Sequence, residues 1–135
     1  MNVLFLVWLI AFGLNGVWEC VHGPLLYDTR RFGGPAGLFP WILLWATLVD
    51  ASLVMLFFVI GAWWWGSMEY FLSGGVDRAL FLLVIGFLFA VWIEYKALFL
   101  FDQWSYNERM PVVFSLGLSP LVQLSATALL VYLFV

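Results

Sequence analysis

Four long apolar stretches dominate the chain, separated by short segments rich in glycine, proline and polar residues. They cover residues of about 3–22, 41–64, 79–101 and 111–134. Each holds roughly the 20 residues that a helix needs to cross a hydrocarbon core about 30 Å thick. Because lipid cannot satisfy exposed backbone groups, apolar spans of this length should be helical. The pattern predicts an all-α fold, a four-helix transmembrane bundle with up-down topology.

The three connecting segments are consistent with these boundaries. The first, "GPLLYDTRRFGGPAGLFP", has Pro24 and Pro40 near its ends. The second, "GSMEYFLSGGVDR", contains Asp77, which we expect to cap the next helix. The third, "DQWSYNERMP", is short and polar, and it ends at Pro111, which the first turn of a helix tolerates.

Composition strengthens the membrane interpretation. Of the 135 residues, 66% are hydrophobic and 10% are charged, and the mean hydropathy is +1.08, which is far outside the range of soluble globular proteins. Residues 1–135 are therefore expected to form a single integral membrane domain. The first stretch has no positive residue before it and no small-residue cleavage site, so it should be a retained helix. The net charge of −3, without a basic cluster, excludes nucleic acid as an expected partner.

The few basic residues predict an orientation. The first and third connecting segments carry Arg30, Arg31 and Arg109, whereas the second carries Arg78. The positive-inside rule therefore predicts that the first and third segments face the cytoplasm.

The polar residues inside the apolar stretches are unevenly distributed. Glu19 and His22 end the first stretch, Asp50 lies in the first half of the second, Glu94 in the last third of the third, and Gln123 near the middle of the fourth. In an up-down bundle, all of them fall in the half of the membrane next to the first and third connecting segments. Ionisable residues within spans are functional-site candidates by default, so we expect these side chains to line one cavity.

Carboxyl groups in such a cavity suit acid/base chemistry on a lipid or isoprenoid. The predicted catalytic residues are Asp50, Glu94 and Glu19. The predicted ligand-binding residues are Asn15, Trp18, His22, Trp92, Tyr106, Asn107, Arg109 and Gln123. Among these, Trp18 or Trp92 would face a cationic intermediate. Tyr106, Asn107 and Arg109 would be available to a polar head group.

Other interpretations stay open at this point. The Glu19-x-x-His22 spacing occurs in carboxylate-bridged dimetal bundles, although it occurs once here, and Asp50 and Glu94 could complete a single-metal site. The sequence could also form an accessory subunit of a larger membrane complex, a homo-oligomer or a small transporter. Because it contains no Walker loop, G-x-S-x-G elbow or H-E-x-x-H motif, phosphoryl transfer and serine hydrolysis are disfavoured. The sequence assigns no cofactor.

Several short motifs support a resemblance that covers most of the chain. They are "NGVWE" followed by "PLLY", the acids at Asp50 and Glu94, "WSYNERMP" and "GLSPLVQL". With these motifs the sequence resembles a family of small four-span bacterial integral membrane proteins of uncharacterised function. The segment from Trp104 to Gln123 is the most specific part, whereas Val49, where that family has glycine, and His22 depart from the pattern. The resemblance implies a location in the bacterial inner (plasma) membrane.

Overall fold

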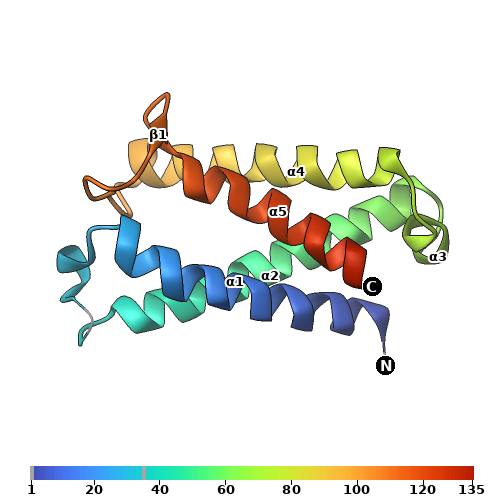
Figure 1. Ribbon diagram of the computed structural model, residues 1–135, viewed down its shortest axis with the longest axis horizontal. Coiled ribbons are helices and arrows are strands. Elements are labelled where there is room, and N and C mark those ends of the chain that lie inside the picture. The colour runs from blue at the N-terminus through green and yellow to red at the C-terminus, as the bar shows by residue number, and fades with distance from the viewer. Residues whose placement is uncertain (1, 35) are drawn as a thin grey trace.

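The computed structural model describes residues 2–34 and 36–135, which are mostly helical. The long helices are α1 (Val3–Leu26), α2 (Phe39–Trp64), α4 (Val76–Tyr95) and α5 (Leu118–Phe134) (Figure 1). A π-helical turn, η2 (Lys96–Leu100), continues α4. The all-α prediction is therefore confirmed.

Shorter elements occupy the connecting segments. A 3₁₀ turn, η1 (Thr29–Phe32), lies between α1 and α2, and a five-residue helix, α3 (Met68–Leu72), lies between α2 and α4. Strands β1 (Val112–Val113) and β2 (Leu116–Gly117) form a small antiparallel hairpin directly before α5.

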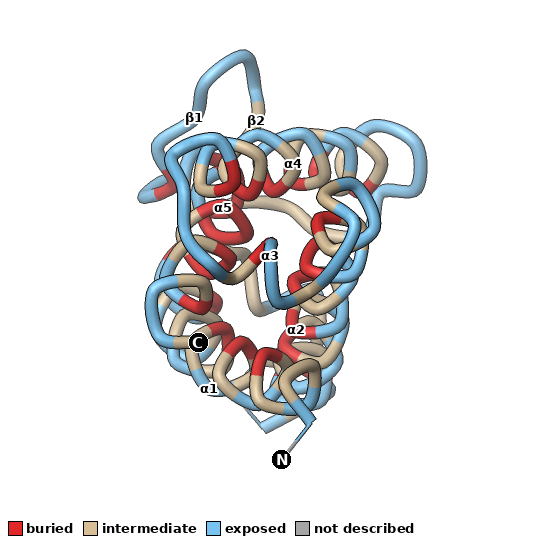
Figure 2. The backbone as a smooth tube through the Cα atoms, turned by 90° about the vertical axis from the view of Figure 1, so that its right-hand side faces the viewer, coloured by how far each residue is buried: buried red, intermediate tan, exposed pale blue. Residues whose placement is uncertain are grey.

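Successive long helices run in opposite directions, and both termini lie at the same end of the molecule (Figure 1). Helix α1 packs along α2, and α4 packs along α5. The buried residues of all four helices face the centre of the bundle (Figure 2). They include Val7, Val54, Phe57, Leu82 and Val131, and they form the apolar core.

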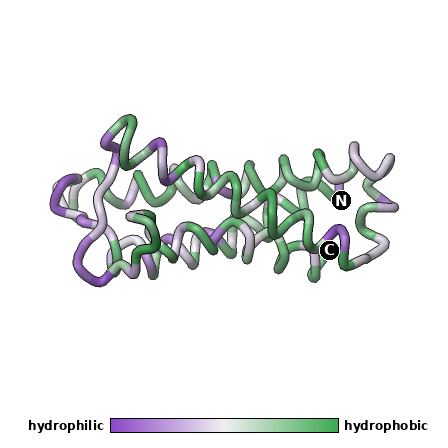
Figure 3. Tube along the Cα trace, turned by 90° about the horizontal axis from the view of Figure 1, so that it is seen from above, coloured by the Kyte–Doolittle hydropathy of each residue, from purple (hydrophilic) through white to green (hydrophobic). Residues whose placement is uncertain are grey.

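Three segments of the described chain are long and apolar enough to cross a membrane: α1, α2 and residues Val76–Leu100. Helix α5 is also apolar, but it is shorter, at 17 residues. Hydrophilic residues gather at the end of the molecule that lies opposite the chain termini (Figure 3). These features are those of an integral membrane protein.

The fourth predicted stretch begins later than expected. The prediction that Pro111 lies in the first turn of a helix is wrong, because residues 112–117 form the hairpin and α5 starts at Leu118. Phe114 and Ser115 both adopt left-handed backbone conformations, with φ of 49° and 66°, as the two central residues of a type I′ turn do. The proline in the first turn of α5 is Pro120. Apolar side chains in the hairpin make it indistinguishable from helix by hydropathy alone.

Two other helix ends also differ from the prediction. Helix α1 continues beyond Pro24 to Leu26, so it is longer than the stretch from 3 to 22. The residue that caps α4 is Gly75, and Asp77 lies within the first turn.

Close contact between α4 and α5 fixes the position of α5. A side chain at Gly86 would place its Cβ 2.8 Å from the backbone nitrogen and Cα of Ser125. The Ser125 hydroxyl donates a hydrogen bond to the Leu83 carbonyl oxygen, at 2.9 Å. Glycine therefore allows the two backbones to approach, and this contact aligns the polar face of α5 with the interior of the bundle.

Candidate functional site

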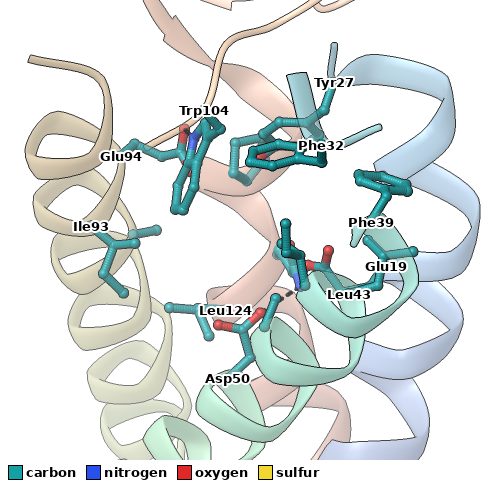
Figure 4. Close-up of a pocket in the computed structure, with 16 residues that line it drawn as sticks. Glu19, Tyr27, Phe32, Phe39, Leu43, Asp50, Ile93, Glu94, Trp104 and Leu124 are labelled. Carbon is teal, nitrogen blue, oxygen red and sulfur yellow. Dashed lines mark hydrogen bonds between the residues drawn. The ribbon is translucent and has the colours of Figure 1, made fainter. Parts of the chain in front are cut away.

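A cavity of about 110 Å³ lies within the bundle at the end formed by the first and third connecting segments (Figure 4). Helices α1, α2, α4 and α5 all contribute to its wall. Its polar lining consists of Glu19, Asp50, Glu94 and Gln123, and we call it the carboxyl cavity. The remaining wall is apolar and aromatic.

A single amide group connects the carboxyl groups of α1 and α2. The Nε2 atom of Gln123 donates to Glu19 Oε1 and to Asp50 Oδ2, both at 2.8 Å, and lies 3.2 Å from Asn15 Oδ1. Asn15 is itself fixed, because its Nδ2 donates to the Ala11 carbonyl oxygen at 3.0 Å and its Oδ1 accepts a hydrogen bond from Thr127. An amide nitrogen carries two hydrogens, so its three acceptors share them. The amide of Gln123 thereby holds α1, α2 and α5 together.

The third carboxyl group is held from the loop side. Glu94 accepts hydrogen bonds from the Tyr106 hydroxyl and from Trp104 Nε1, the latter at 3.4 Å. The Tyr106 hydroxyl in turn accepts from the backbone N–H of Gly117, at 2.9 Å. Burial raises the pKa of Tyr106 above its ordinary value, and the hydrogen bond to Glu94 raises it further, so the hydroxyl remains a proton donor at neutral pH.

The third connecting segment closes this end of the cavity because it is fastened to the end of α1. Tyr27 and Tyr106 form an antiparallel β-bridge. The backbone N–H of Asp28 donates to the Ser105 carbonyl oxygen at 3.0 Å, and that of Asn107 donates to the Leu26 carbonyl oxygen at 2.9 Å. These bonds place the ring of Tyr27 edge-on against Trp104, with 6.2 Å between ring centroids.

The ion pairs of the described chain lie in the connecting segments. Arg30 pairs with Asp28 at 3.0 Å, and Arg31 pairs with Asp102 at 2.9 Å. The hydrogen bonds from these arginines lower the pKa of each aspartate below its ordinary value. Among the described residues, no lysine, arginine or histidine forms an ion pair with a carboxyl group of the cavity.

The structure brings together the three predicted catalytic acids and some of the predicted ligand-binding residues. Glu19, Asp50, Glu94 and Gln123 line the cavity, whereas Asn15 and Tyr106 lie behind them as hydrogen-bond partners. Their roles in binding or catalysis remain predictions.

His22 and Trp18 face a neighbouring helix, outside the lining of the cavity. His22 Nδ1 lies 2.5 Å from the Ser119 hydroxyl of α5, and its ring lies against that of Trp18, with 4.5 Å between centroids. Within residues 2–34 and 36–135, no three His, Cys, Asp or Glu side chains are grouped so that they could hold a metal ion. The geometry thus gives no support to the single-metal alternative.

Three further predicted ligand-binding residues, Trp92, Asn107 and Arg109, also lie outside the lining of the cavity, and their roles in ligand binding stay predictions. Trp92 is 56% exposed on the outer face of α4, because Ala90, which lines the cavity, lies two residues and about 200° away around the helix. Asn107 uses its side-chain amide to bind the Leu25 carbonyl oxygen, at 2.8 Å, so it fastens the loop. Arg109 is exposed and absent from the lining.

Sequence reasoning missed the apolar and aromatic part of the lining, which includes Tyr27 and Trp104. Trp104 lies two residues before Tyr106 in an extended segment, and alternate residues of an extended chain share a face, so this spacing was a usable signal. Nothing comparable marked Tyr27, whose position depends on its pairing with the distant third segment.

The arrangement provides three carboxyl groups that can donate or accept protons within an enclosure of apolar and aromatic side chains. The chain matches no protein-family model, and it has no significant match among curated proteins or solved structures.

Proposed function

We propose that the protein is a four-span integral membrane protein of the bacterial inner membrane whose carboxyl cavity, located in one leaflet, binds one end of a lipid or isoprenoid and exchanges protons with it. The observation that carries the proposal is the convergence of Glu19, Asp50 and Glu94 on one enclosed cavity. Buried ionisable groups within membrane helices are costly and tend to be functional.

A fourth span is compatible with the length of α5. Its 17 residues extend about 25 Å, at a rise of about 1.5 Å per residue, slightly less than the hydrocarbon thickness of about 30 Å. Because α5 packs along α4, it would cross the membrane beside it. The hairpin before α5 would then lie at the level of the head groups.

The volume of the cavity limits what enters it. A cavity of about 150 Å³ accommodates benzene, so about 110 Å³ suits only one end of a lipid. Ile42 and Ala46 of α2 and Ile93 of α4 line the cavity and are partly exposed. The apolar chain would leave the cavity between α2 and α4 and continue into the bilayer.

The carboxyl groups would carry the chemistry. One carboxylic acid donates a proton to the bound group while a carboxylate removes a proton from another atom of it, so the bound molecule is isomerised without net gain or loss of atoms. Asp50 on α2 and Glu94 on α4 line the cavity from different helices and suit this pair of roles. Glu19 shares the Gln123 amide with Asp50. It would therefore influence whether Asp50 is protonated.

Mass spectrometry of the gently purified protein tests this proposal, first native and then denaturing to identify extracted lipids. We expect a specific lipid or isoprenoid to accompany the wild type and to be depleted in Glu94→Gln and Asp50→Asn. Glu69→Gln is the matched control, since Glu69 is an exposed acid in α3, at the other end of the bundle. Identical bulk lipid in wild type and all variants would contradict the proposal.

A second candidate function is that of a subunit in a larger membrane complex or homo-oligomer. Trp41 and Trp45 favour it, because they lie one helical turn apart on α2 and are 70% and 68% exposed, and tryptophan is enriched at protein interfaces. The same native spectra distinguish the candidates. A stable complex that survives in both acid-to-amide variants, without a specific lipid, would favour the subunit.

A further inference from the structure

We infer that the group entering the carboxyl cavity is an organic cation, either a protonated amine or a quaternary ammonium, carried on an apolar chain. This inference rests on the proposed function and names the chemical class of its ligand.

The first support is the charge of the lining. Glu19, Asp50 and Glu94 all face one cavity, and no lysine, arginine or histidine is among the residues that line it. The two ion pairs of the described chain are located elsewhere. Carboxylates that are removed from water without a cationic partner are costly, and a bound cation would offset that cost.

The second support is the availability of acceptor atoms. The protein's own hydrogen bonds to the three acids use Glu19 Oε1, Asp50 Oδ2 and Glu94 Oε2. The second oxygen of each acid has no such bond, and it is also not among the fully buried polar atoms of the described chain that lack a partner, which are Trp18 Nε1 and Arg78 Nε. Each second oxygen is therefore accessible and can accept a hydrogen bond from a ligand. An ammonium group supplies several donors and no acceptor.

The third support is the aromatic part of the wall. The side chains of Tyr27, Phe32, Phe39 and Trp104 line the loop end of the cavity, and Asp50 lies at the opposite end (Figure 4). The faces of aromatic rings attract cations, most strongly in desolvated sites. Acidic and aromatic side chains that line one cavity are complementary to a positive group that also has an apolar surface.

The spacing of the acids favours an organic cation over a metal ion. A hard metal ion collects several oxygen ligands at about 2.0–2.6 Å from one point. In the described chain, no three His, Cys, Asp or Glu side chains form such a group. The three acids of the cavity lie on three different helices, α1, α2 and α4. An ammonium group several atoms across can contact acids that are distributed in this way. The same distribution would stabilise positive charge that develops during proton transfer to a lipid.

Binding of three molecules with the same isoprenoid chain tests the inference: farnesylamine, farnesol and N-acetylfarnesylamine. Each would be measured on the full-length protein in neutral detergent at pH 7, by native mass spectrometry or equilibrium dialysis, after subtraction of partitioning into empty micelles. We expect farnesylamine to bind at least about tenfold more tightly than either neutral molecule, because hydrogen bonds between charged groups are stronger than those between neutral groups. Propylamine, which has the charge without the chain, should bind much more weakly.

Variants connect the preference to the cavity. We expect Glu19→Gln combined with Asp50→Asn to reduce the preference for the amine to less than about threefold, because most of the charge-assisted bonding is lost and the affinity for farnesylamine falls more than that for farnesol. Glu69→Gln removes one exposed acid and should leave the preference unchanged. An unaltered preference in the double variant would overturn the inference.

The remaining outcomes separate this inference from the proposed function. Equal affinity for farnesylamine and farnesol would overturn the cation inference and leave a lipid-binding cavity in place. Propylamine binding as tight as that of farnesylamine would overturn the requirement for an apolar chain. Failure of all four molecules to bind would count against both proposals.

Discussion

Gln123 shows how much of the site can depend on one residue. Its Nε2 is the hydrogen-bond donor shared by Glu19 and Asp50, and the side chain is buried. Replacing Gln123 by leucine keeps a side chain of similar size and removes these two bonds together with the contact to Asn15. We expect Gln123→Leu to lower the free energy of unfolding by about 1–2 kcal/mol. This value lies between the cost of leaving a buried acceptor without a donor and the smaller energy of a hydrogen bond between membrane helices.

The measurement is equilibrium unfolding in mixed micelles with increasing fractions of denaturing detergent. Val122→Ala is a control on the adjacent position of α5, because Val122 is 44% exposed on the outside of the helix. If Gln123→Leu unfolds at the same detergent fraction as the control, the shared amide contributes nothing measurable to stability.

Asp102 provides a pH-dependent contact between the first and third connecting segments. Its bond to Arg31 lowers the pKa of Asp102, so the folded state binds this proton less readily than the unfolded chain. The stabilisation is fully present above the ordinary aspartate pKa of about 3.9, and it is lost as the pH falls through the lowered folded value. Asp102→Asn should remove it at every pH, because asparagine tolerates the left-handed conformation at φ 47° but carries no charge.

Limited proteolysis of the loops at pH 3 and pH 7 checks this prediction. The wild type should be cleaved faster at pH 3 than at pH 7, relative to a protease standard. Asp102→Asn should show a smaller difference between the two, because Asp28 is then the remaining arginine-paired aspartate of these loops. Equal cleavage of wild type and variant at pH 7 would show that this ion pair does not hold the segments together.

At the scale of elements, the contact between α4 and α5 sets the position of the cavity wall. Because a Cβ at Gly86 would meet the backbone of Ser125, Gly86→Val must force the two helices apart. We expect it to destabilise the fold by about 1–3 kcal/mol, the usual cost of overpacking. Gly13→Val is the matched control, since a Cβ at Gly13 has nothing within 4 Å and the substitution carries the same change in helix propensity.

Differential scanning calorimetry in detergent would compare the unfolding temperatures of the two glycine variants. A lower unfolding temperature for Gly86→Val than for Gly13→Val is the expected result. Equal unfolding temperatures would mean that α5 can shift along or away from α4 without cost, and that Gln123 is not held in place by this contact.

The sequence indicates the elements and the depth of the polar groups better than it indicates the loops. Hydropathy is a local property, so it marks the long helices. A constant rise per residue predicts similar depths for Asp50 and Glu94, with Glu19 shallower and Gln123 deeper. The hairpin before α5 escapes such reasoning because its residues are as apolar as a helix. Tyr27 enters the cavity through its bridge to Tyr106, a non-local pairing that no local pattern encodes. Trp92 was misplaced because depth alone does not say which side of α4 faces inward.

The whole molecule is asymmetric along its long axis. The carboxyl cavity and the first and third connecting segments lie at one end (Figures 3 and 4). The core of the half near the termini is formed mainly by aromatic and aliphatic side chains. Phe57, Phe58 and Phe71 are completely buried there. A carrier that releases its cargo on both sides would need polar groups in both halves. The asymmetry therefore favours a site that receives its ligand from one leaflet.

Membrane topology is the prediction at this scale that bears on every other. Four spans with the first and third connecting segments in the cytoplasm place residues 2, 69 and 134 outside and residue 108 inside. Cys20 is the one cysteine in the sequence, so a Cys20→Ser background allows single cysteines to be introduced at Asn2, Glu69, Glu108 and Phe134. In intact bacterial spheroplasts, an impermeant maleimide should label the cysteines at 2, 69 and 134, and the cysteine at 108 only after lysis.

Labelling of 69 and 134 from opposite sides would show that α5 does not cross the membrane, and the cavity would then lack the lipid-embedded wall that the proposed function requires. Labelling of 108 alone in intact cells would keep four spans but reverse their orientation, placing the cavity in the outer leaflet and its ligand among the lipids found there.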